Sequence, residues 1–143
     1  RNQVLFRFTI GAASDRLLRY WEPGAPRFRE RLNSLQHAYQ QDFPTSVSIE
    51  PMLDAPHVAD LFQKLKPHVT HSIWIGKMNR VRHQVRIVTP DDEQAVRRIE
   101  ANQTDERIRA IYESLKDEPL VRWKDSIKEV VGLVRAEKAG LDV

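Results

Sequence analysis

The feature that most constrains the fold of this chain is the alternation of β-rich runs with amphipathic helical segments. Three apolar runs rich in β-branched and aromatic residues occupy positions 4–10, 45–50 and 71–76, and amphipathic segments separate and follow them. Strands that alternate with helices are typical of a parallel sheet with right-handed crossovers. We therefore predict an α/β fold of the kind found in doubly wound sheets and in βα-barrels.

Helix starts are marked by capping residues and by apolar residues at helical spacing. Ser14 or Asp15 is placed to cap a short helix, and Pro26 is placed to open a longer amphipathic one. Thr89 precedes a proline and several acidic residues, and Thr104 precedes another amphipathic set, which together predict two further helices. A helix is also predicted between the second and third strands.

The last third of the chain is mainly helical in this interpretation. Residues 119–123, PLVRW, predict a short strand, and Ser126 with Glu129 has the spacing of a capping box before a final helix. The segment 84–88, QVRIV, is compatible with an irregular or edge strand. The 143 residues fit a single domain, with βα units over 1–88 and C-terminal helices with one short strand over 89–143.

Composition excludes several classes of protein. Hydrophobic residues make up 41% of the chain and charged residues 30%, which is typical of a globular domain. No apolar run is long enough to span a bilayer, and no signal peptide is recognisable, so we expect a cytoplasmic protein without a membrane partner. The absence of cysteine excludes disulfides, thiolate metal sites and a cysteine nucleophile within the chain. The five histidines lack zinc-ligand spacing.

Arginine clusters leave a nucleic-acid partner possible. They lie at 80–86 and 97–98, but acidic residues are interleaved with them and the net charge is only +3. Without aromatic residues between the arginines, this is a weak nucleic-acid signal. The phosphate-binding GxGxxG and GxxxxGK[ST] motifs and the GxSxG nucleophile motif are absent.

Polar residues gather where the three predicted strands end. Ligands of parallel sheets bind at the carboxyl ends of the strands, so these residues form the candidate site. They supply hydroxyls, a carboxylate, an ammonium, an amide and a glycine, which suits a small polar ligand with charged groups and ribose hydroxyls. The candidates are Thr9, Gly11, Ser48, Glu50, Lys77 and Asn79. In a purely structural alternative, Glu50 and Lys77 form an ion pair, and Thr9 and Ser48 fill strand positions.

Five segments, in order, carry a resemblance to a known family. They are VLFRFTIG, YWEPGAPRFRERLNSLQHAYQ, TSVSIEPMLD, HSIWIGKMN and KDSIKEV. Together they resemble the second half of the radical S-adenosylmethionine (radical SAM) core of proteins related to spore photoproduct lyase. The combination of WEPGAP, SIEPMLD and IGKMN is more specific than any one of these motifs.

The resemblance implies a partial TIM-like βα-barrel, of which this chain is the C-terminal half with about three to four βα units and extra helices. Residues 4–10, 45–50 and 71–76 would be its fourth, fifth and sixth strands. The CxxxCxxC loop that binds a four-iron four-sulfur (4Fe–4S) cluster would lie upstream of Arg1, in a missing N-terminal half that is the expected partner. The whole enzyme would cleave S-adenosylmethionine to a 5′-deoxyadenosyl radical, and this half alone would be inactive.

The same resemblance implies roles for the candidate residues. Thr9 would face S-adenosylmethionine, Ser48 and Glu50 would hold its ribose and methionine groups, and Lys77 with Asn79 would form the far wall. In half a barrel an inner sheet face would lack its usual cover, and part of it would face another copy of the chain, the C-terminal helices or the missing half, so we also expect a homo-oligomer. That face is built from Val4, Phe6, Phe8, Val47, Ile49, Ile73 and Ile75. The alternatives are a nucleic-acid-binding module of a DNA-repair-type protein and a non-catalytic interaction domain.

Overall fold

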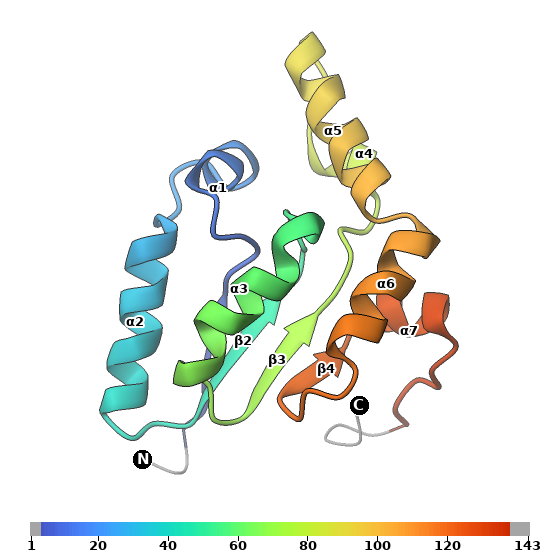
Figure 1. Cartoon of the computed structure of the whole chain (residues 1–143). Helices are drawn as coiled ribbons and strands as arrows, with labels where there is room; N and C mark the ends of the chain where they lie inside the picture. The colour runs from blue at the N-terminus through green and yellow to red at the C-terminus, as the bar shows by residue number, and fades with distance from the viewer. Residues whose placement is uncertain (1–3, 138–143) are drawn as a thin grey trace.

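The computed structural model describes residues 4–137, which form a sheet of four parallel strands with helices packed against it (Figure 1). The strands are β1 (Phe6–Thr9), β2 (Thr45–Ile49), β3 (Ser72–Ile75) and β4 (Val121–Trp123). They lie side by side in chain order, each parallel to the next. This confirms the predicted α/β class, and the sequential order is that of an open part of a βα-barrel, without the reversal of a doubly wound sheet.

Seven α-helices connect and follow the strands in the described part of the chain. They are α1 (Asp15–Trp21), α2 (Phe28–Gln40), α3 (Val58–Leu65), α4 (Val81–Gln84), α5 (Pro90–Asn102), α6 (Asp105–Leu115) and α7 (Asp125–Val131). Two 3₁₀ turns, η1 (Ala55–His57) and η2 (Lys66–His68), flank α3. None of these helices is long and apolar enough to cross a membrane.

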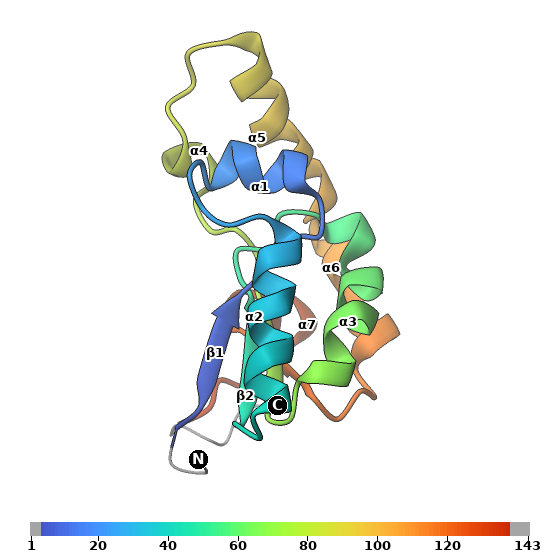
Figure 2. The same cartoon turned by 90° about the vertical axis from the view of Figure 1, so that its left-hand side faces the viewer.

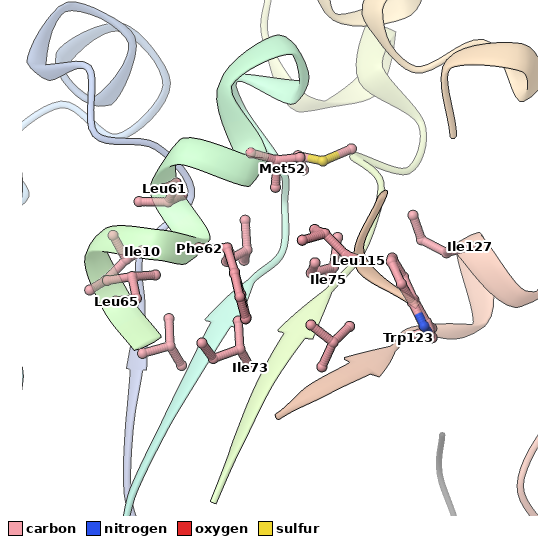
Figure 3. Close-up of a cluster of buried hydrophobic side chains, with 14 of the residues drawn as sticks. Ile10, Met52, Leu61, Phe62, Leu65, Ile73, Ile75, Leu115, Trp123 and Ile127 are labelled. Carbon is pink, nitrogen blue, oxygen red and sulfur yellow. The ribbon is translucent and has the colours of Figure 1, made fainter. Parts of the chain in front are cut away.

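The main core lies between the sheet and the helices α2, α3 and α6, which cover one face (Figure 2). Val47, Ile49, Ile73 and Ile75 are fully buried there, and Phe62 of α3 packs among them (Figure 3). Of the three covers that we expected for this face, the C-terminal helices are the one present for these four residues, since α6 packs on them together with α2 and α3. The apolar positions of each strand point outward to the helices, as they do in a βα-barrel.

The start of β1 and the residues just before it are the exception to this burial. Val4 and Phe6 remain 50% and 39% exposed, and Phe8 is partly buried against the main core. Phe6 makes an edge-to-face contact with Phe43, whose ring centroid lies 4.9 Å away. The premise of the homo-oligomer prediction thus holds only for this short apolar end of β1.

The predicted helix caps are mostly present. The Ser14 hydroxyl accepts a hydrogen bond from the backbone N–H of Leu17, and Thr89 forms a full capping box with Asp92. Thr104 caps α6 in the same way as Ser14 caps α1. These caps satisfy N–H groups that a helix start leaves without a partner.

The capping box predicted at Ser126 and Glu129 is wrong. Lys124 is the N-cap of α7 and makes no side-chain capping bond, so Ser126 already lies within the first turn. Its hydroxyl instead accepts a hydrogen bond from the backbone N–H of Lys77 at 3.0 Å. Ser126 therefore ties the loop after β3 to α7.

The connection between β3 and α6 extends beyond the carboxyl edge of the sheet and contains α4 and α5 (Figure 1). Residues 85–88, within the segment left open as an edge strand, form no regular element and follow directly after α4. Gln103 fixes the base of this extension, because its buried side chain bonds both the N–H and the C=O of Met78. A second apolar cluster that includes Leu18, Leu53 and Val96 fills the space between the extension and α1.

Candidate functional site

The face of the sheet opposite the helices is polar. Because side chains alternate along a strand, the residues between the buried apolar positions share this face. One row across the four strands consists of the register partners Thr9, Ser48, Trp74 and Arg122. A second row, nearer the amino ends of the strands, contains Arg7, Ser46 and Ser72. We call this surface the open face.

Small residues and one large aromatic residue form the middle of the open face. Ser46 and Ser72 are buried, and their hydroxyl oxygens lie 2.9 Å apart in a hydrogen bond. Two cations lie near the half-buried indole of Trp74: the Arg7 guanidinium carbon is 5.9 Å from the ring centroid and the Lys124 Nζ is 5.0 Å from it. Both distances are within the range of cation–π attraction.

Glu50 lies at the carboxyl end of β2 and reaches across the end of β3. A Cβ added to Gly76 would lie 2.2 Å from Glu50 Oε2 and 2.8 Å from Glu50 Cδ, so any larger residue would displace the carboxylate. The Glu50 Oε1 is 3.9 Å from the Lys124 Nζ, and both side chains are about one-third exposed. These contacts form one continuous group of four residues, which we call the Glu50 group: Glu50, Gly76, Lys124 and Trp74.

The lysine that approaches Glu50 was not the expected one. The structural alternative paired Glu50 with Lys77, but no ion pair joins these two residues in the described part of the chain. Lys77 instead donates a hydrogen bond from its backbone N–H to the hydroxyl of Ser126. Lys124, which directly follows β4, supplies the cation because β4 pairs with β3 and brings its end beside Gly76.

Gly11 serves chain packing at the edge of the candidate site. An added Cβ would lie 2.6 Å from the carbonyl oxygen of Pro51, and the Gly11 carbonyl accepts a hydrogen bond from the N–H of Leu53. The loops after β1 and β2 can therefore approach each other only because residue 11 has no side chain.

Thr9, Ser48 and Asn79 differ in their surroundings. Thr9 and Ser48 are register partners on the open face, and the Thr9 carbonyl accepts from Arg31 Nη1. Asn79 is exposed in the loop after β3, and its carbonyl accepts from Gln84 Nε2. The structure therefore brings Thr9, Ser48 and Glu50 onto one face. Lys77 and Asn79 instead make hydrogen bonds through their backbone groups, to Ser126 and Gln84.

The arginine clusters are partly neutralised within the chain. Arg82 bonds both Glu93 and Glu100, and Arg97 also bonds Glu93. The hydrogen bonds from Arg82 and Arg97 hold the pKa of Glu93 below its usual value. These ion pairs reduce the positive charge available to a nucleic acid from residues 80–86 and 97–98.

Three members of the Glu50 group, Gly76, Trp74 and Lys124, were not among the predicted site residues. Trp74 was expected to pack, and Lys124 lies outside the three strand ends that were considered. Strand alternation gives a usable signal for Trp74, since it lies two residues before Gly76 on the same face. For Lys124 the signal was the short strand 119–123, whose pairing with the third strand was not considered.

The residues present fit only one of the two cofactors that the resemblance implies. The chain has no cysteine, and the described residues contain no group of three His, Asp or Glu side chains that could hold a metal ion, so the cluster does not fit these residues. The hydroxyl, carboxylate, ammonium and indole groups of the open face do match the polar groups of S-adenosylmethionine. Comparison of the chain with protein-family models, with curated proteins and with solved structures gave no match.

Proposed function

We propose that this chain is the C-terminal half of a radical SAM partial barrel and that its open face holds part of S-adenosylmethionine. Two lines of reasoning support the proposal. The first is the resemblance of the ordered motifs WEPGAP, SIEPMLD and IGKMN to that family. The second is the parallel, sequential sheet whose face opposite the helices is polar.

The observation that carries the proposal is the geometry of the Glu50 group. A carboxylate that crosses a glycine to lie 3.9 Å from a lysine places opposite charges side by side at the carboxyl end of a parallel sheet. Glu50 is suited to a ligand ammonium or to ribose hydroxyls, and Lys124 is suited to a ligand carboxylate. Trp74 offers a flat apolar surface next to both, and the Thr9 and Ser48 hydroxyls lie in the adjacent row.

The cluster belongs to another part of the proposed enzyme. In the family that the motifs resemble, a 4Fe–4S cluster supplies the electron that cleaves S-adenosylmethionine, and three cysteines bind it. This chain has no cysteine, so its own contribution would be to bind and orient the cofactor. We expect no turnover from these 143 residues alone.

The decisive experiment is on the coding region and on the longer protein that it specifies. We expect a CxxxCxxC motif upstream of the codon for Arg1, and a brown protein with an iron–sulfur absorbance band after anaerobic reconstitution. A natural reading frame that carries no cysteine triad ahead of this segment would refute the proposed function.

Ligand binding by the present chain gives a second test with matched controls. Titration with S-adenosylmethionine is expected to show weak binding, with a Kd on the order of millimolar, because only part of the pocket is present. Glu50→Gln should abolish this binding, whereas Glu106→Gln on the exposed first turn of α6 should not affect it. Equal binding by the two variants would separate Glu50 from the cofactor.

The nucleic-acid alternative makes a different prediction. It requires binding to duplex DNA that weakens steeply with salt and that depends on Arg80 and Arg86. Because Arg82 and Arg97 are already paired with glutamates, we expect only weak and nonspecific binding through this region.

A further inference from the structure

A groove lies between α1 and α5, apart from the residues of the Glu50 group. It has a volume of about 340 Å³, within the range of small-molecule pockets. Arg16, Tyr20 and Trp21 line it from α1, and Asp91, Gln94 and Arg98 line it from α5. Both helices lie beyond the carboxyl edge of the sheet, where Figure 2 shows α1 crossing beside α5. A hydrogen bond of 2.7 Å from the Tyr20 hydroxyl to Asp92 Oδ1 joins the two helices.

The groove has two arginines without a carboxylate partner. Neither Arg16 nor Arg98 makes an ion pair with any residue that the structure describes. Other arginines of this region do: Arg31 pairs with Glu22, and Arg82 and Arg97 pair with Glu93. Among the residues that line the groove, Arg16 and Arg98 are therefore exposed cations whose charge is still available to a ligand.

Asp91 also lines the groove, next to Asp92 in the sequence of α5. Asp92 accepts from Tyr20, and Asp91 lies seven residues before Arg98 on α5, which is about 10 Å along a helix. On α1, Arg16 precedes Tyr20 by one turn. Asp91 is therefore separated from Arg98 by about two turns of α5.

Aromatic and apolar side chains line the rest of the groove. Tyr20 and Trp21 contact each other edge to face, with ring centroids 5.0 Å apart, and both are partly buried. Leu17 and Ile99 add apolar surface from the two helices. A flat ring can pack on such a surface while an attached anion reaches the guanidinium groups.

We propose that the groove between α1 and α5 is a binding site for a nucleoside phosphate. Arg16 and Arg98 bind the phosphate, and the rings of Tyr20 and Trp21 contact the base. The same chemistry is presented by a free nucleotide and by an exposed nucleotide of a single-stranded nucleic acid. The proposal does not depend on the proposed function, because it uses no residue of the open face.

The test is titration of the whole chain at low salt with three probes: AMP, inorganic phosphate and a short single-stranded oligonucleotide. Amide chemical-shift perturbation reports where each probe binds and how tightly. We expect AMP to bind with a Kd of about 1 mM or lower and to perturb amides of α1 and α5. Saturation by the oligonucleotide and not by AMP would also support the site and would assign it to a nucleic-acid strand.

Variants separate the site from general charge effects. The double variant Arg16→Gln/Arg98→Gln should weaken binding at least roughly tenfold, as expected for the loss of charge-assisted bonds. Arg109→Gln, on the exposed surface of α6, removes the same kind of charge and should leave the affinity unchanged. Gln94→Glu puts a negative charge into the groove without changing the core, and it should weaken binding severalfold.

Three results would overturn the proposal. They are the absence of binding by AMP and the oligonucleotide alike, an equal effect of Arg109→Gln and the double variant, and inorganic phosphate binding as tightly as AMP. Circular dichroism of each variant confirms that the fold is retained, so a loss of binding can be assigned to the groove.

Discussion

Two glycines at neighbouring strand ends provide a sharp test of the structure, because the same substitution should have different effects on them. In Gly11→Ala the new Cβ meets a backbone atom, the carbonyl oxygen of Pro51, at 2.6 Å. In Gly76→Ala the new Cβ meets side-chain atoms of Glu50 and of Lys124, at 2.2 Å and 2.9 Å for the nearest atom of each. Backbone in a buried loop cannot move aside easily, whereas a partly exposed carboxylate can rotate away.

The expected costs follow from these contacts. For Gly11→Ala, overpacking should cost about 1–3 kcal/mol of the free energy of unfolding, less about 0.4–1 kcal/mol from the smaller entropy of the unfolded chain. For Gly76→Ala, the main loss is the contact between Glu50 and Lys124, and an ion pair of this exposure is worth about 0–1 kcal/mol. The loss of this ion pair and the stabilisation from the smaller entropy of the unfolded chain nearly cancel. The free energy of unfolding of Gly76→Ala should therefore stay within about 1 kcal/mol of the wild-type value.

The assay is urea denaturation of the wild type and both variants, followed by circular dichroism and by tryptophan fluorescence. Gly11→Ala should lower the urea midpoint clearly, and Gly76→Ala should change it little while it abolishes ligand binding that depends on Glu50. If Gly76→Ala destabilised the chain as much as Gly11→Ala, the Glu50 carboxylate would not be the movable neighbour of Gly76, and the geometry of the Glu50 group would be wrong.

Three further predictions concern the contacts that hold the extension and α7 in place. Hydrogen bonds from Tyr20 and, next, from the backbone N–H groups of Val88 and Thr89 lower the pKa of Asp92 to about 2, so the stabilisation is complete above the ordinary carboxyl pKa and is lost as the pH falls through about 2. Tyr20→Phe removes the largest of these contributions, so the stabilities of the wild type and of this variant should converge in an acid titration over that range. Ser126→Ala should lower the free energy of unfolding in urea by about 1–2 kcal/mol, because it leaves the backbone N–H of Lys77 without a partner. Glu129→Ala should lower it by less, because α7 has no capping box. Gln103→Leu should cost about 2–4 kcal/mol in the same assay, since a buried N–H and a buried C=O both lose their partner; a cost below that of Ser126→Ala would contradict this assignment.

Local patterns predicted the elements of this fold well. The caps at Ser14, Thr89 and Thr104 depend only on residues within one turn, and the structure has all three. The Ser126 cap failed because a tertiary partner, the N–H of Lys77, competes for the hydroxyl. A local motif cannot show such competition, since the two residues are 49 positions apart in the sequence.

The candidate site was only partly predictable for a similar reason. Thr9, Ser48 and Glu50 could be placed together because consecutive parallel strands end at the same edge of a sheet. The partner of Glu50 could not, because it comes from β4, whose position next to β3 depends on the whole excursion through α5 and α6. The groove between α1 and α5 was also missed, since its two walls belong to different crossover connections.

The correction to the sheet faces changes what the open face can do. An apolar open face would need another copy of the chain to cover it, and we predicted an oligomer on that ground. The observed open face instead presents hydroxyls, Glu50, Lys124 and one indole, while the apolar strand residues are buried under the helices. A face of this composition does not need a protein cover to be stable in water, and covering it with another chain would take the partly exposed Glu50 and Lys124 out of water. The arrangement therefore favours a ligand-binding surface over a subunit interface, with the apolar start of β1 as the part of the sheet still suited to contact with another chain.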